Sequence, residues 1–370
     1  MSASSRWFPA LVAALLAGSM IAAAQQPSAP LVNQTGSPPQ GARSAQSSVL
    51  HVRTAPPSRT ILLDVVVTSK PGQPVTGLSQ QDFTILDDKT PREITSFEAV
   101  DGQKQPVEAI LLIDAVNTGY TVIAQERTEI DKFLRANGGK LTLPTSLAVF
   151  GDQGIKMQGA YSRDGNALAD NLAKYTIGLR EIGRSAGFQG AAERLTDSLK
   201  AIRTLVQYES PRPGRKIILW VSPGWPLLSG PGENLSANQQ TQVFNDITFL
   251  SAALREAQTS VYAIDPLGVG ESVAQALAYE QFTDGVKKPS NDHIGNLALQ
   301  VIANETGGLV RNSTGVSGLL QECVADNVAY YRLSFELPPT EKRDVYHALK
   351  VTVAKPGLTV ATSTGYYAEP

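Results

Sequence analysis

An alternation of apolar runs and helical segments between residues 106 and 329 constrains the fold most strongly. Residues 107–113 are apolar apart from Glu108, which is typical of a parallel strand buried on both faces. Similar runs predict strands over residues 146–150, 155–160, 217–221, 260–264 and 308–311. Helical periodicity predicts helices over residues 121–136, 167–175, 190–208, 241–258, 294–306 and 316–329. Such alternation predicts a Rossmann-like α/β domain, a mostly parallel sheet with helices on both faces.

Short β-rich segments flank this domain on both sides. Those before it are residues 61–68, 82–86 and 94–98, and those after it are 330–337, 346–353 and 358–364. Three short strands alone cannot enclose a core of much depth. We therefore expect the two flanks to pack together as one discontinuous small β-sandwich. Residues 59–105 and 330–370 would be its two parts, and the α/β domain, 106–329, would be inserted between them.

The first 58 residues predict export. Arg6 precedes an apolar stretch, residues 8–24, which ends in small residues at Ala24. This pattern predicts a signal peptide over residues 1–24 that is cleaved near Ala24, and hence a secreted or periplasmic protein. An uncleaved membrane anchor is the alternative. No later stretch is long and apolar enough to span a bilayer, and residues 25–58 have the composition of a disordered linker.

Composition and motifs argue against several function classes. The formal net charge of -2 gives no electrostatic reason to expect nucleic-acid binding. Cys323 is the single cysteine, and His51, His293 and His347 show no metal-ligand spacing. The motifs of serine hydrolases, P-loop NTPases, zinc proteases and dinucleotide-binding enzymes are absent from the sequence. The pair Asp87–Asp88 lies in a predicted turn, so we expect no enzyme.

Motifs in the α/β domain and in its flanks indicate a family. The first buried strand ends in Leu111-Leu112-Ile113-Asp114, as in von Willebrand factor A domains. The flanking motifs are Gly72-x-Pro74-Val75-x-Gly77-Leu78-x-x-x-Asp82-Phe83, then Asp87-Asp88, and a terminal Gly365-Tyr366-Tyr367-Ala368. From about residue 60 to its end, the chain resembles the von Willebrand A-related proteins known mainly from Acidobacteria. This resemblance implies a secreted protein whose A domain binds a partner rather than catalyses a reaction.

The resemblance also implies a place for a metal-ion-dependent adhesion site, which takes Mg²⁺ or Mn²⁺ on oxygen ligands. Asp114 matches its first ligand, Thr118 can replace a serine, and Asn117 lies between them. The other serine position holds Val116, the expected threonine is missing near residues 190–193, and Ser222 follows the third strand where an aspartate is expected. We therefore interpret the site as degenerate and assign no cofactor. A structural role in capping the loop and the next helix is the favoured alternative.

The loops that follow the buried strands are the predicted partner-binding elements. They contain Ser222, Trp225 and Asp265, and a long insertion follows Asp265. The predicted function is thus an exported binding module for an unidentified protein or surface partner. The alternative is a secreted envelope enzyme, or a structural envelope factor, without a recognisable catalytic motif.

Overall fold

The computed structural model describes residues 59–102, 107–157, 159–174, 187–224, 236–267, 287–288, 299–338, 342 and 345–368. They all belong to one compact unit, Ala55–Pro370. The predicted signal peptide and linker lie outside the described residues, and so does Trp225. Among the helices that are described, none is both long enough and apolar enough to cross a membrane.

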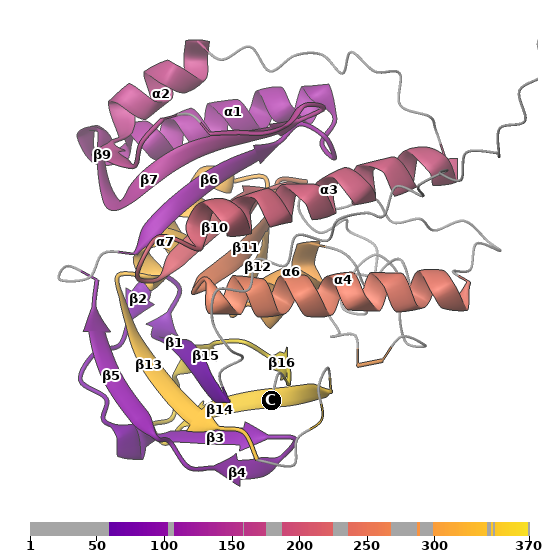
Figure 1. Cartoon of the computed structure of the whole chain (residues 1–370). Coiled ribbons are helices and arrows are strands. Elements are labelled where there is room, and N and C mark those ends of the chain that lie inside the picture. The colour runs from indigo at the N-terminus through magenta and orange to yellow at the C-terminus, as the bar shows by residue number, and fades with distance from the viewer. Residues whose placement is uncertain are drawn as a thin grey trace, which may run out of the picture. The chain divides into compact units, whose positions relative to one another are not determined.

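The central element is a seven-stranded sheet of order β12-β11-β10-β6-β7-β8, with β9 paired to β7 (Figure 1). Its parallel strands are β6 (Glu108–Asp114), β7 (Lys140–Gly151), β10 (Lys216–Val221), β11 (Thr259–Asp265) and β12 (Val310–Asn312). Only β8 (Gly154–Met157) and β9 (Ser162–Asp164) run antiparallel, both against β7. The expected mixed α/β architecture with a mostly parallel sheet is therefore present.

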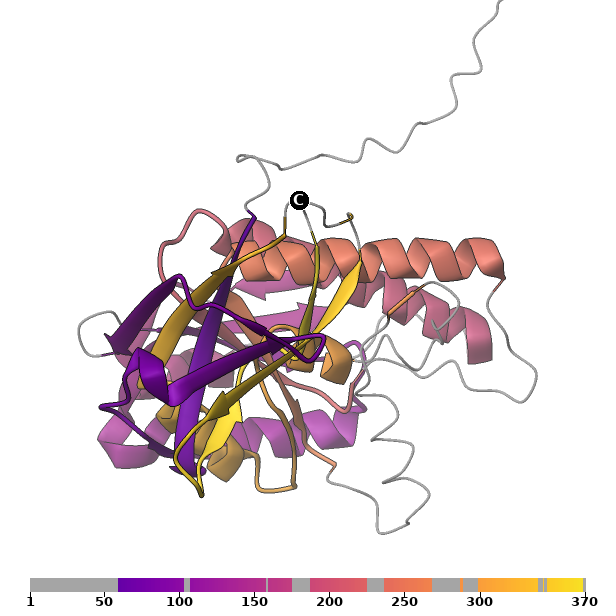
Figure 2. The ribbon, with the colours of Figure 1, turned by 90° about the horizontal axis from the view of Figure 1, so that it is seen from below.

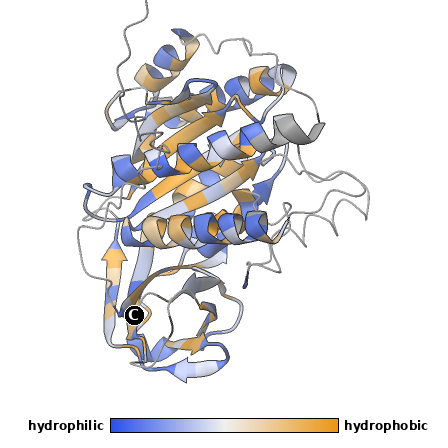
Figure 3. Ribbon diagram, turned by 45° about the vertical axis from the view of Figure 1, so that its right-hand side comes forward, coloured by the Kyte–Doolittle hydropathy of each residue, from blue (hydrophilic) through white to orange (hydrophobic). Residues whose placement is uncertain are grey.

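Helices cover both faces of this sheet. On one face lie α1 (Tyr120–Arg135), α2 (Gly165–Lys174) and α7 (Val316–Asp326), and on the other α3 (Gly187–Glu209), α4 (Ala237–Glu256) and α6 (Leu299–Glu305). Alternate residues of β6 serve the two cores: Leu111 and Ile113 pack toward α1, whereas Ile110 and Leu112 pack toward α3. This explains the continuous apolar run, and Figure 3 shows the same strands as the most hydrophobic part of the fold.

Two further sheets combine segments from both flanks. One has the order β15-β1-β13-β5, with β2 on β1, and the other has the order β16-β14-β3-β4. The strands from the first flank are β1 (Thr60–Lys70), β2 (Gln73–Pro74), β3 (Phe83–Asp87), β4 (Thr90–Arg92) and β5 (Ser96–Asp101). Those from the second are β13 (Ala329–Glu336), β14 (Tyr346–Val353), β15 (Thr359–Ala361) and β16 (Gly365–Tyr367).

The two flanking sheets share one apolar core. Leu63 and Leu333 contribute to it from the first sheet, and Ile85 and Val351 from the second. The pairing of β1 with β13 and of β3 with β14 brings residues more than 250 positions apart into register. Figure 2 shows these early and late strands side by side.

Tyr367 links β16 to two helices that cover the central sheet, α4 and α6. Its ring is 1 % exposed and meets Phe244 of α4 edge-on, with 5.8 Å between centroids. Its hydroxyl donates to Glu305 of α6 at 3.2 Å, and the same carboxylate accepts from Ser251 of α4 at 2.6 Å. The terminal Gly-Tyr-Tyr-Ala motif thus packs into the interior rather than forming a free tail.

Element boundaries differ from the sequence prediction in several places. Strand β5 is displaced toward the C-terminus relative to 94–98, and β7 starts six residues before the predicted 146. The predicted 358–364 strand ends early, at Ala361, and a separate strand, β16, follows it. Short 3₁₀ helices, Gln80–Asp82 and Ala136–Gly139, occur in the connections. These boundaries depend on pairing with partner strands, and the local pattern of apolar residues does not contain that information. The first part of the predicted helix 294–306 lies outside the described residues.

Candidate functional site

The candidate site lies at the carboxyl edge of the central sheet. Asp114 ends β6, Ser222 follows β10, and Asp265 ends β11. The three strands are neighbours in parallel register, with Ile113 opposite Val221 and Val221 opposite Ile264. The fold therefore brings together at one edge three residues that the sequence analysis selected from separate loops.

Asp114 is fully buried and accepts five hydrogen bonds. Its Oδ1 accepts from the backbone N–H groups of Val116 at 2.9 Å and Asn117 at 2.8 Å. Its Oδ2 accepts from Asn117 Nδ2 at 2.9 Å, Trp220 Nε1 at 3.1 Å and Ser222 Oγ at 2.9 Å. Burial raises the pKa of Asp114, and the hydrogen bonds from Asn117, Trp220 and Ser222 oppose that rise. The carboxylate thereby ties the loop after β6 to the loop after β10.

These donors do not fit a metal ion at Asp114. A carboxylate offers about four lone-pair sites, and five donors already point at this one. The neighbouring ligand position of an adhesion site is occupied by Val116, whose side chain is buried and has no oxygen. The hydrogen bonds between Asp114 and Asn117 match the loop-holding part of the structural alternative. The helix-capping part is wrong, because the N-cap of α1 is Gly119 and no side chain caps the helix.

The remaining polar groups around Asp114 extend this network. Asn117 Nδ2 also lies 3.0 Å from Ser198 Oγ on α3, and Ser198 in turn donates to the Arg194 carbonyl at 2.8 Å. Thr118, the third predicted ligand, is 1 % exposed. Ser222 Oγ accepts from the Gly224 N–H at 3.1 Å, which shapes the start of the next loop. Ser198 lies five residues beyond residues 190–193, where the sequence places the expected contribution of α3.

Glu126 adds a third buried acid near Asp114 and Asp265. It lies in the second turn of α1, is 1 % exposed, and has no hydrogen-bond partner for either carboxyl oxygen among the described residues. Burial, followed by the charges of Asp114 and Asp265, raises the pKa of Glu126 to about 9. It is therefore protonated at neutral pH. Its place between Ile123 and Ile130 on the apolar face of α1 was the available sequence signal.

Asp265 is held by a backbone hydrogen bond. Its Oδ1 accepts from the Leu267 backbone N–H at 2.9 Å, and burial raises its pKa. It therefore shapes the turn after β11, as an aspartate before proline commonly does. Trp225, the other predicted partner-binding residue, lies outside the described residues.

Two large apolar side chains are exposed at this edge. Tyr120 opens α1 directly after the Asp114 loop and is 65 % exposed. Leu267 comes two residues after Asp265 and is 55 % exposed. A buried polar layer thus lies beneath an edge that presents an aromatic ring and a leucine to solvent. Such side chains are suited to contact with another molecule.

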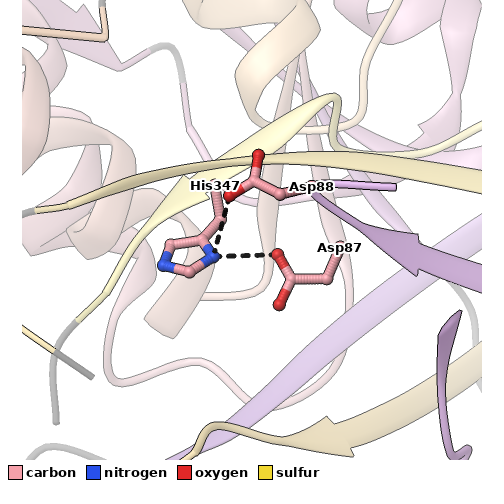
Figure 4. A group of neighbouring side chains, drawn as sticks. All are labelled: Asp87, Asp88 and His347. Atoms are coloured by element: carbon pink, nitrogen blue, oxygen red, sulfur yellow. Dashed lines mark hydrogen bonds and ion pairs between the residues drawn. The ribbon is translucent and has the colours of Figure 1, made fainter. Parts of the chain in front are cut away.

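A second polar cluster lies in the flanking sheets. Asp87 and Asp88 meet His347, whose Nδ1 is 2.9 Å from Asp87 Oδ1 (Figure 4). One ligand atom from each of the three residues lies within 4.8 Å of the other two. No metal-ligand spacing marks His347 in the sequence, because 260 positions separate it from Asp87 and only strand pairing brings the two together.

Comparisons with known proteins identify no family. No family model matches the chain, and no curated protein matches it. Similar solved structures include the conserved hypothetical protein BatB from Bacteroides thetaiotaomicron, at 11 % identity and a TM-score of 0.32, covering 59 % of this chain and 97 % of that one. The VWA domain of SpRpn10 is similar at 12 % identity and a TM-score of 0.29, covering 58 % of this chain and 93 % of that one.

Proposed function

We propose that this protein is an exported von Willebrand A-like binding module, inserted in a discontinuous β-sandwich, that recognises a protein or surface partner through the carboxyl edge of its central sheet. One observation carries the proposal. Asp114, fully buried and bound by five donors, holds the edge loops in place from within the protein. We infer that this hydrogen-bond network takes the place of an ion in organising the loops, and we assign the protein no catalytic step.

The exposed side chains at the edge support a contact that is apolar at its centre. Tyrosine is enriched among the residues that contribute most to binding, because its ring buries a large area and loses little side-chain entropy. Tyr120 opens α1 next to the loop that is hydrogen-bonded to Asp114, and the backbone N–H of Leu267 is hydrogen-bonded to Asp265. Rigid loops lower the entropic cost of binding.

Site-specific photocrosslinking in the organism that makes the protein tests the binding edge. A photoreactive phenylalanine analogue at Tyr120 should capture a partner. The matched control is the same analogue at Lys132, which is on the last part of α1 and has a 69 % exposed side chain. An adduct at position 120 that is missing at position 132 supports the proposal. Identical adducts at both positions, or none at position 120, contradict it.

Purified partner then tests the energetics and the metal dependence. Tyr120→Ala should weaken binding at least tenfold, since truncating a central aromatic contact costs about 2 kcal/mol or more. Lys132→Ala should bind like the wild type. Chelation by EDTA, or addition of Mg²⁺ or Mn²⁺, should leave the Kd unchanged. A tenfold gain in affinity with Mg²⁺ would show that the partner binds through a metal, contrary to the proposal.

A further inference from the structure

We propose that Asp87, Asp88 and His347 form a binding site for one Zn²⁺ ion or a similar divalent transition-metal ion. Asp87 ends β3, Asp88 begins the turn to β4, and His347 lies near the start of β14. All three side chains converge on the same point in Figure 4. The cluster belongs to the flanking sheets, so it is separate from the binding edge proposed above and does not depend on it.

The distances match those between ligands of one metal ion. His347 Nδ1 lies 2.9 Å from Asp87 Oδ1 and 3.4 Å from Asp88 Oδ2. Zinc binds histidine nitrogen and carboxylate oxygen at about 2.0–2.2 Å, so two ligands at the tetrahedral angle are about 3.4 Å apart. An ion can therefore replace the proton between these atoms with small side-chain adjustments. One imidazole with two carboxylates favours zinc and its neighbours over Mg²⁺ or Ca²⁺, which prefer oxygen alone.

The protein holds one oxygen of each carboxylate and directs the other at His347. Asp87 Oδ2 accepts from Arg92 Nε at 2.8 Å and from the Tyr366 hydroxyl at 3.2 Å, and its Oδ1 faces the imidazole. Asp88 Oδ1 accepts from the Ala348 N–H at 3.0 Å, and its Oδ2 faces the imidazole. Outer contacts of this kind orient the ligands of metal sites.

The imidazole is oriented as well. The Tyr366 ring stacks on it, with 4.8 Å between ring centroids and 15° between planes. His347 is 5 % exposed and Asp87 is 1 % exposed, whereas the Asp88 side chain is 56 % exposed. The site is therefore buried on two sides and open to water on the third. That arrangement gives an ion an entry path and a position for a water ligand.

The turn at Asp88 points to the same role. Asp88 and Lys89 both have left-handed backbones, with φ of 46° and 69°, in a two-residue hairpin connection between β3 and β4. Such turns favour asparagine, aspartate or glycine at their first position, so Asp88 fits its backbone there. Glycine would also fit the turn but would supply no carboxylate. The turn thus places an oxygen of the Asp88 carboxylate 3.4 Å from His347 Nδ1.

Calorimetric titration of the purified protein with ZnCl₂, after EDTA treatment and removal of the chelator, tests the site. We expect one zinc per chain and a thermal unfolding temperature that rises with zinc. Asp88→Asn and His347→Gln should each weaken zinc binding at least tenfold. Asparagine tolerates the left-handed backbone, so Asp88→Asn keeps the turn and remains informative if His347→Gln fails to fold.

The matched controls are the other two histidines. His51→Gln and His293→Gln should bind zinc like the wild type. Mg²⁺ should not compete with zinc at the site. The proposal is overturned if the wild type takes up no zinc, or if Asp88→Asn binds zinc with wild-type affinity. In the first case the cluster is only a hydrogen-bonded Asp–His contact that joins β3 to β14.

Discussion

Replacing Glu126 with glutamine should stabilise the protein, by an amount that grows with pH. In the folded protein the pKa of Glu126 is raised to about 9, against an ordinary value of 4.5, because its carboxyl group is buried beside Asp114 and Asp265. Between these two values the unfolded chain is ionised at this position while the folded protein keeps the proton. Folding must therefore take up a proton, and stability falls as pH rises through this range.

The magnitude follows from the size of the pKa shift. Each pH unit between the two pKa values costs about 1.4 kcal/mol, so the cost at pH 7 is about 3 kcal/mol. Below the unfolded pKa both states are protonated, and the cost vanishes. Glutamine has nearly the same shape as glutamate and does not ionise, so the unfolding free energy of the variant does not carry this pH-dependent cost. Any penalty for burying the glutamine amide is the same at every pH and leaves the slope untouched.

Urea unfolding at pH 6, 7 and 8 measures the effect. The difference in unfolding free energy between Glu126→Gln and wild type should increase by about 3 kcal/mol from pH 6 to pH 8. Glu129→Gln, on the same helix, is the reference for losing one acidic group from α1. A difference that stays constant from pH 6 to pH 8 would show that Glu126 is ionised in the folded protein, and the reasoning would be refuted.

Three further predictions concern other buried groups. Asp114→Ala withdraws the acceptor from five donors and should lower the unfolding free energy by about 3 kcal/mol or more, measured by urea unfolding. Tyr367→Phe keeps the packing but removes the hydrogen bond to Glu305; it should cost about 1 kcal/mol in the same assay, and no loss would disprove the contact. Cys323 is fully buried, and burial raises the pKa of its thiol to about 12, so a thiol reagent at pH 8 should label it in urea and leave it unlabelled in the folded protein.

The sequence alone was sufficient for the mixed α/β class and for most strands and helices of the described residues. Residues 107–113, apart from Glu108, and residues 217–221 are apolar on both faces, and this pattern occurs where a strand is covered from two sides. The apolar residues at helical spacing along α1 show which face of the helix is buried. The local pattern of apolar residues shows which side chains are buried, because burial repeats along a strand or helix with the period of that element. The residues at strand ends could also be selected, since the carboxyl ends of parallel strands share one edge.

Only the tertiary structure decided which groups those residues contact. Asp114 was a candidate metal ligand in the sequence. Its five donors come from the following loop, from Trp220 of β10 and from Ser222 just after β10, and the last two are more than 100 positions away. Likewise, the pairing of β3 with β14 brings His347 to Asp87. Periodicity reports whether a side chain is buried, whereas hydrogen-bond partners and pKa values depend on which distant atoms share that buried space. That depends on strand order and register, which are properties of the whole chain.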